Sequence, residues 1–88
     1  LSIYGNRLNR INANMLNGLE NLQILDMGYN YISFIDNQSF KYLINLNKLN
    51  LAFNCLKDLE PDLFVELNQL NYLNLAHNKL SCLKESFN

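Results

Sequence analysis

The segment Leu46–Gln69 has the sequence LNKLNLAFNCLKDLEPDLFVELNQ, and its pattern recurs on both sides. The preceding residues, Leu22–Asn45, are LQILDMGYNYISFIDNQSFKYLIN, and the pattern starts again at Leu70 with LNYLNLAHNKLSCL. One asparagine returns at the same interval throughout, as Asn6, Asn30, Asn54 and Asn78. A fixed period of this length is typical of stacked repeats. We therefore expect a single segment, 1–88, made of repeats at 1–21, 22–45, 46–69 and 70–88.

Each repeat is numbered here from its first leucine, so that Leu22, Leu46 and Leu70 occupy position 1. Apolar residues then fall at positions 4, 6, 11, 14, 19 and 22. The alternation at positions 4 and 6 predicts a short strand with one buried side. Such a strand buries little surface alone, so the coils are expected to stack, with their strands in a parallel sheet.

The return segment of each coil is less regular. Ile11–Gly18 and Leu59–Leu67 are predicted to form a turn followed by a short helical or 3₁₀ piece. Pro61 restricts the backbone at the start of the second of these arcs. Phe40 and Phe64 share position 19, and we expect them to stack in successive coils as a second line of core residues.

The asparagine at position 9 follows the predicted strand, where the backbone turns. Its side-chain amide contains both donors and an acceptor, and can pair with backbone groups that the turn leaves open. We interpret the four as a structural ladder inside the stack: Asn6, Asn30, Asn54 and Asn78.

Composition excludes several classes of function. The 88 residues are 49% hydrophobic and have a net charge of −1, with no basic patch visible along the chain. Nucleic acid and anionic membranes are therefore not expected partners. No apolar run reaches the length of a membrane-spanning helix. No cofactor or metal site is implied, and His77, the only histidine, has no nucleophile at a recognisable motif spacing, so no catalytic residue is predicted.

The frame LxxLxLxxNxLxxLxxxxFxxLxx resembles the typical form of the leucine-rich repeat. Phe40 and Phe64 match the phenylalanine of extracellular animal members, and LNLAFN (Leu49–Asn54) and LNLAHN (Leu73–Asn78) resemble Toll-like receptor ectodomains and insect secreted immune proteins. The resemblance implies an α/β right-handed solenoid of about 3.5 repeats. Its parallel sheet would lie on the concave face, with short helical, 3₁₀ or loop segments on the convex face.

The same resemblance implies a non-enzymatic role in protein recognition, in an extracellular or cell-surface protein of innate immunity. The partner would be a protein ligand or a partner subunit. Two alternatives stay open: the repeat domain of a developmental or adhesion receptor, and an intracellular scaffold.

The chain also departs from the family pattern. It has no cysteine-rich cap at either end, and it opens in mid-pattern without Met. Position 19 of the fourth repeat is Asn88, with Phe87 one residue early. We therefore expect an internal fragment whose neighbours are further repeats or caps of a longer chain.

Positions 3, 5 and 7 of the strand would point away from the core, onto the concave face. There the side chains vary while the frame stays constant, and aromatic residues with a few charges suit protein contacts. The alternative is an ordinary solvated sheet face. The candidate ligand-binding residues are Tyr4, Ile24, Asp26, Lys48, Asn50, Tyr72 and Asn74.

Position 8 holds Gly5, Tyr29, Phe53 and His77, an aromatic stripe for which packing along the edge of the solenoid is the favoured interpretation. Cys55 and Cys82 occupy positions 10 and 13 of adjacent repeats, so they are out of register. A disulfide needs Cα atoms within about 7 Å, so free thiols are expected, while pairing with cysteines elsewhere stays open.

Asn37-Gln38-Ser39 is an N-glycosylation sequon. Asn37 falls at position 16, on the outer arc, where a glycan would leave the concave face clear. Glycosylation of Asn37 is therefore expected if the protein is secreted. The alternating Asp58, Glu60 and Asp62 are interpreted as a solvated outer surface.

Overall fold

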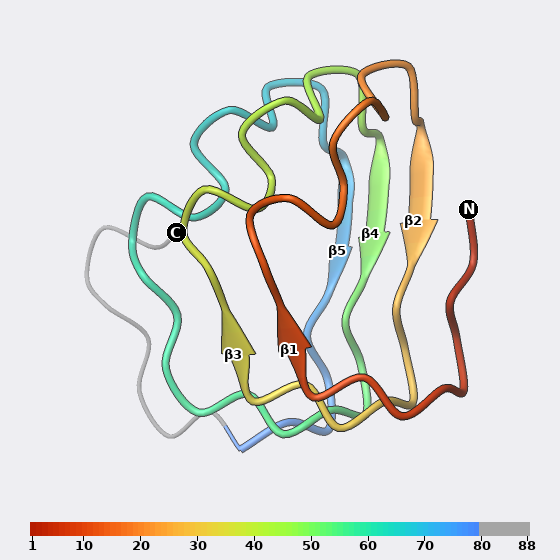
Figure 1. Cartoon of the computed structure of the whole chain (residues 1–88), viewed down its shortest axis with the longest axis vertical. Helices are drawn as coiled ribbons and strands as arrows, with labels where there is room; N and C mark the ends of the chain where they lie inside the picture. The colour runs from red at the N-terminus through yellow and green to blue at the C-terminus, as the bar shows by residue number, and fades with distance from the viewer. Residues whose placement is uncertain (80–88) are drawn as a thin grey trace.

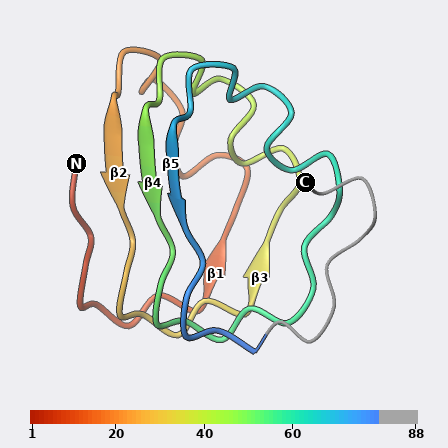
Figure 2. The ribbon, with the colours of Figure 1, turned by 180° about the vertical axis from the view of Figure 1, so that it is seen from behind.

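The computed structural model describes residues 1–79, which wind through successive stacked coils (Figure 1). The repeats at 22–45, 46–69 and 70–88 supply strands β2 (Ile24–Asp26), β4 (Lys48–Asn50) and β5 (Tyr72–Asn74). These strands form a parallel sheet in the order β2-β4-β5 (Figure 2). A bridge between Ser2 and Asp26 adds the first coil. The predicted parallel sheet is confirmed.

The register of the sheet follows the period of the sequence. Leu25 pairs with Leu49, and Leu49 pairs with Leu73, so each partner lies one whole repeat further on. Because every strand is displaced by one repeat, equivalent positions lie side by side across the stack. A feature of one position therefore becomes a row that runs from coil to coil.

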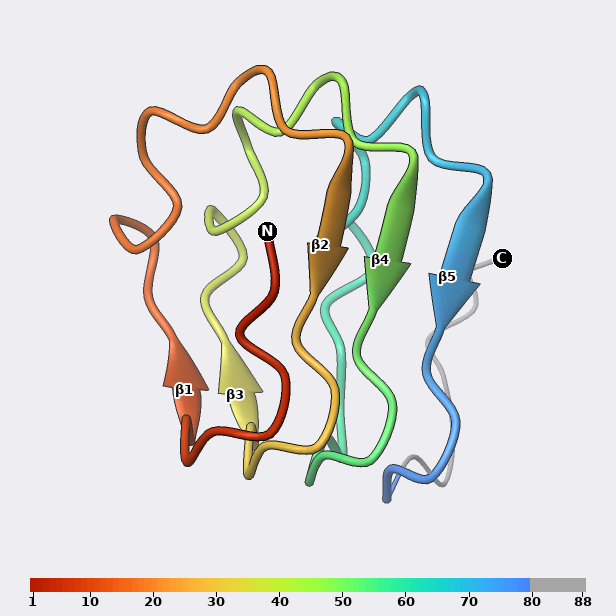
Figure 3. The ribbon, with the colours of Figure 1, turned by 90° about the vertical axis from the view of Figure 1, so that its right-hand side faces the viewer.

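A second, smaller sheet was not predicted. Strands β1 (Arg10–Ile11) and β3 (Phe34–Ile35) pair in parallel at positions 13 and 14, separate from the larger sheet (Figure 3). Ile11 and Ile35 are buried, whereas Arg10 and Phe34 are exposed. The Arg10 guanidinium carbon lies 4.9 Å from the centre of the Phe34 ring, so a cation–π contact covers the outer side of this sheet.

The convex arc is made of turns, and the helical or 3₁₀ piece expected over Ile11–Gly18 and Leu59–Leu67 was wrong for these residues. The N–H of Leu63 donates to the carbonyl of Glu60 at 3.1 Å, and that of Val65 to Asp62 at 3.2 Å. The donors alternate along the chain, whereas a 3₁₀ helix needs them at consecutive residues. The arc is therefore a series of overlapping turns, each closed by one hydrogen bond.

The core lies between the sheet and the arc. The Phe40 and Phe64 rings stack with centroids 5.8 Å apart and planes 13° from parallel, which confirms the predicted second line of core residues. Position 18 also faces inward: Leu63 is buried, and so is Ser39, whose hydroxyl donates to the Ile11 carbonyl at 3.3 Å.

Burial depends on neighbouring coils. Leu25 and Leu49 are fully buried, whereas the equivalent Leu73 is 38% exposed on β5, at the edge of the described sheet. Each coil thus covers the apolar side chains of the coil before it, as expected for a repeat stack. Within residues 1–79 there is no helix with the length and apolar character needed to cross a membrane.

Candidate recognition surface

The position-9 asparagines link consecutive coils. The Asn54 amide nitrogen donates to the carbonyls of Leu51 (3.0 Å), Ala52 (3.2 Å) and, in the preceding coil, Met27 (3.1 Å). Its oxygen accepts the N–H of Ile32, also in the preceding coil, at 3.0 Å. Because the amide is buried, the backbone N–H and carbonyl groups at the turns of both coils depend on it for their hydrogen bonds.

Asn30 and Asn78 repeat this arrangement one coil earlier and one coil later. Their oxygens accept the N–H groups of Leu8 (3.1 Å) and Leu56 (3.0 Å). Asn6 differs: it is exposed, and its amide donates to Ile3 and Tyr4 of its own coil, at 2.9 and 3.5 Å.

Position 5 forms a second polar row. In a regular parallel ladder the Gly28 N–H would face the Ile3 carbonyl, but the Asn30 amide occupies that carbonyl at 3.0 Å. The Gly28 N–H instead donates to the Asp26 carboxylate at 3.0 Å. The side chain at position 5 therefore satisfies an N–H group that the position-9 asparagine has displaced.

The same substitution of partners occurs in the next two coils, and the first coil has the same cap at position 5. The oxygens of Asn50 and Asn74 accept the N–H two residues later, each at 3.0 Å, and the Ser2 hydroxyl does so at 3.4 Å. Sequence reasoning missed this role. The signal was present, because Ser, Asp and Asn are the side chains that cap a nearby backbone N–H.

Three of the predicted ligand-binding residues thus have structural contacts. Asp26, Asn50 and Asn74 each use one oxygen for their own backbone, and the Asn50 amide also donates to the Asp26 carboxylate at 3.0 Å. The Asn74 amide contacts the Tyr72 hydroxyl at 3.3 Å. These side chains are half-buried, so they present less free polar surface than their sequence positions indicate.

The remaining predicted residues are exposed on the concave face. Ile24, Lys48 and Tyr72 occupy position 3 of β2, β4 and β5 and pair in register. Tyr4 is the predicted residue at position 7, and it is exposed as well. A Cβ atom built on Gly28 would lie 3.2 Å from the Tyr4 ring, so this ring covers the glycine.

The aromatic residues at position 8 form a column along one edge of the solenoid. Tyr29 and Phe53 stack with centroids 4.1 Å apart, and Phe53 and His77 at 4.2 Å, with both pairs 12° from parallel. Tyr4 meets Tyr29 at 5.0 Å in a tilted contact. These contacts form the packing that was predicted for this edge.

All three column residues have left-handed backbones, with φ of 53°, 59° and 57° at Tyr29, Phe53 and His77. Gly5 takes the same position with φ 75°. This conformation costs about 1–2 kcal/mol for a residue other than glycine, and stacking is worth about 0.5–1.5 kcal/mol for each pair. The stacking of the rings therefore offsets the free-energy cost of the left-handed backbone at these residues.

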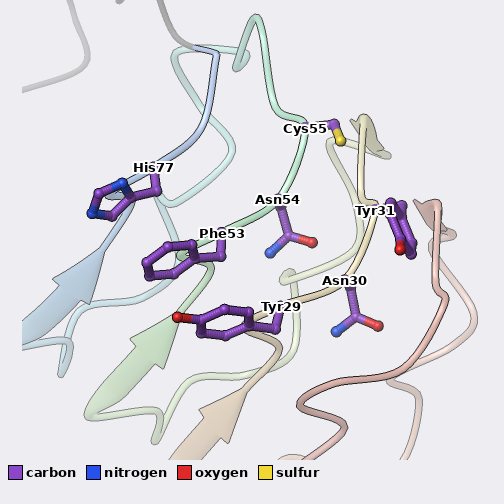
Figure 4. Close-up of a pocket in the computed structure, with 7 residues that line it drawn as sticks. All are labelled: Tyr29, Asn30, Tyr31, Phe53, Asn54, Cys55 and His77. Atoms are coloured by element: carbon purple, nitrogen blue, oxygen red, sulfur yellow. The ribbon is translucent and has the colours of Figure 1, made fainter.

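Beside the column is an open hollow of about 360 Å³. Asn30 and Asn54 lie between the stacked rings on one side and Tyr31 and Cys55 on the other (Figure 4). The Tyr31 side chain is 60% exposed. Sequence reasoning did not single out Tyr31, because position 10 shows no common residue type.

The other predicted residues lie outside these surfaces. Asn37 is exposed on the arc, within its sequon, and residues 1–79 contain no cluster of side chains able to hold a metal ion. Cys55 is a free, half-buried thiol within the same range. Cys82, Phe87 and Asn88 lie outside the described residues, so the expectation about Cys55 and Cys82 stays a prediction.

The in-register strands and the asparagine row define a leucine-rich-repeat solenoid. A model of the leucine-rich repeat matches residues 1–44 and 21–80, and the chain belongs to this family. Its structure is also similar to part of a chain in the glycosylated Toll–Spatzle complex of Drosophila, with a TM-score of 0.86 and 29% identity over 90% of this chain. The predicted resemblance to Toll-type ectodomains is confirmed.

The match spans 11% of that solved chain, which is described as part of a molecular hub in Drosophila development and innate immunity. No curated protein matches the sequence. Leucine-rich repeats, including those of this structural neighbour, are protein-recognition modules, and such modules are typically not enzymes.

Proposed function

We propose that this chain is part of the recognition surface of an extracellular Toll-type receptor, or of a secreted immune factor, and that it binds a protein ligand through its concave face. The observation that carries the proposal is the exposed row Ile24, Lys48 and Tyr72, which crosses three strands in register. An aliphatic, a cationic and an aromatic side chain side by side on one sheet offer apolar area, charge and a hydroxyl to one partner.

The row is also well suited to recognition because hydrogen bonds tie the neighbouring position-5 side chains to the sheet. The Asp26–Asn50 hydrogen bond and the position-5 caps hold the adjacent row in place. Asp26, Asn50 and Asn74 would then meet a ligand mainly as supports, with Ile24, Lys48, Tyr72 and Tyr4 as the main contacts. A developmental receptor is the second candidate, since the structural neighbour is described for development as well as immunity.

The test places a photo-crosslinking aromatic amino acid at Tyr72, with Tyr42 of the arc as the matched control. These tyrosines are exposed to 49% and 53%. Each variant is incubated with extracellular fluid and, separately, with cytosol from the source organism. We expect a crosslinked extracellular protein from Tyr72 and none from Tyr42. Crosslinks confined to cytosol, or equal at the two positions, would contradict the proposal.

A second measurement identifies the contact surface. The triple variant Ile24→Ala, Lys48→Ala, Tyr72→Ala leaves the core and both polar rows in place, so its melting temperature should match the original. We expect the affinity for the crosslinked protein to fall at least about tenfold, as for the loss of central contact residues. An unchanged affinity would remove this row from the interface.

A further inference from the structure

Over residues 1–79 as a whole, positive and negative side chains fall at different repeat positions. Residues 1–79 contain six Lys and Arg side chains, and four of them fall between positions 10 and 13: Arg7 and Lys79 at position 10, next to the aromatic column at position 8, and Arg10 and Lys57 further along the coil. Within the same range, Asp58 is the single carboxylate in those positions. The arc between positions 15 and 24 has the opposite balance, with Lys41 against Glu20, Asp36, Glu60, Asp62 and Glu66. A net charge near zero thus conceals a basic edge and an acidic arc.

The basic edge is aligned with the hollow. Backbone bonds of 2.8 Å run from Tyr31 to Leu8, from Cys55 to Ile32 and from Lys79 to Leu56. Position 10 therefore forms a row in the order Arg7, Tyr31, Cys55 and Lys79. Tyr31 and Cys55 line the hollow, and Arg7 and Lys79 are their neighbours on either side in this row.

The cations of this edge favour anions, and the aromatic column does so as well. Tyr29, Phe53 and His77 cover one another's faces at 4.1 and 4.2 Å, so they present mainly ring edges to solvent. The edge of an aromatic ring carries the positive part of its quadrupole. Exposed, stacked rings beside a row of cations form a surface that favours carboxylates and also accepts an apolar side chain.

We propose that this edge binds an acidic segment of a protein partner, with one aromatic or aliphatic side chain of that segment in the hollow between Tyr31 and the aromatic column. Carboxylates on either side of that anchor would meet Arg7 and Lys79. The surface is distinct from the concave row of Ile24, Lys48 and Tyr72, so it does not depend on the ligand proposed there.

A protein segment fits this surface better than a nucleic acid does. Single-stranded nucleic acids are held by bases stacked on open aromatic faces, and the faces of Phe53 are covered on both sides. The floor of the hollow also offers little hydrogen bonding to a base, because the Asn30 and Asn54 amides are already bonded to backbone.

The test selects peptides from a random display library on the whole chain and measures the affinity of the selected peptides by fluorescence anisotropy. We expect sequences that combine several Asp or Glu residues with one Phe, Tyr, Trp or Leu. Binding should weaken as salt is added, because exposed charges are screened. Selected peptides without an acidic excess, or with affinity independent of salt, would overturn the proposal.

Matched variants locate the site. Tyr31→Ala and Lys79→Glu should each lower the affinity of the peptide about tenfold, the order expected for a central contact or a reversed charge. Tyr42→Ala and Lys41→Glu make the same changes on the arc and should leave it unchanged. Arg7→Glu gives a second charge reversal if Lys79→Glu perturbs folding, which a melting curve reveals.

Two further outcomes would count against the proposal. Loss of peptide binding in Tyr72→Ala but not in Tyr31→Ala would move the peptide to the concave face. A single-stranded oligonucleotide that binds as tightly as the peptide, and loses affinity in the same edge variants, would assign the edge to nucleic acid. Neither outcome alters the test of the concave row, so the two proposals fail separately.

Discussion

The Asn54 side-chain oxygen accepts the N–H of Ile32, from the preceding coil, at 3.0 Å. Both groups are buried. The bond joins the turn of one coil to the turn of the next, so the stability of each coil depends on an amide supplied by its neighbour.

Replacement of that amide should therefore destabilise more than one coil. For Asn54→Ala we expect a loss of about 1–3 kcal/mol in the free energy of unfolding, because the buried N–H of Ile32 loses its acceptor. Urea unfolding measures the change. Asn6→Ala is the matched control: its amide is exposed and, within residues 1–79, bonds only its own coil, so its cost should stay below about 1 kcal/mol. Equal costs would contradict the inter-coil role.

The position-5 row predicts a graded response at Asn50. Asn50→Leu removes the acceptor for the Ala52 N–H and the donor to Asp26, and should cost about 1–2 kcal/mol. Asn50→Ser should retain more stability than Asn50→Leu, because the Ser2 hydroxyl already caps the equivalent N–H in the first coil. The midpoints of urea unfolding compare the two variants. A leucine variant as stable as the serine variant would show that the cap contributes little.

The left-handed backbone at Phe53 predicts that an asparagine variant is more stable than a valine variant, whereas hydrophobicity alone would predict the opposite. Phe53→Val and Phe53→Asn both remove the stack with Tyr29 and His77. Asparagine tolerates a φ of 59°, whereas a β-branched residue does not. We expect the valine variant to be about 1–2 kcal/mol less stable than the asparagine variant. Paired denaturation curves give the difference, and a more stable valine variant would refute the strain argument.

The exposed sequon at Asn37 predicts glycosylation that does not require the fold to change. Its side chain is exposed, so expression through a secretory pathway should add a glycan that a glycosidase removes, with a matching change in mass. Asn37→Gln should abolish the glycan and leave the melting temperature of the unglycosylated protein unchanged. Ser39→Ala is the poorer control, because the buried Ser39 hydroxyl bonds the Ile11 carbonyl. A secreted protein without added mass would show that the sequon is unused.

The strand side was predictable because one period governs it. Leu25, Leu49 and Leu73 recur at a constant interval, and this spacing alone implies their in-register pairing. The second sheet was not predictable, since Arg10–Ile11 and Phe34–Ile35 are too short to show alternation. The arc is less regular in sequence, and the turn with a short helical or 3₁₀ piece expected there is not what forms, since its turns close at alternate residues.

The candidate surfaces were predictable only in part. Outward positions on a strand follow from its pleat, which placed Ile24, Lys48 and Tyr72 correctly on the exposed side. The backbone contact of Asp26 depends on where the Asn30 amide donates, and that is a property of two coils together. The hollow beside Tyr31 likewise exists only once the coils are stacked.

The alternating turns of the arc have a consequence for how such a chain can change length. On the strand side, one inserted residue would shift every row at once and break bonds at positions 5 and 9 in two coils. In the arc the hydrogen bonds that close the turns stay within one coil, so an added or lost residue disturbs the turns of that coil alone. Insertions and deletions among related sequences should therefore collect in the arc, where they leave both recognition surfaces intact.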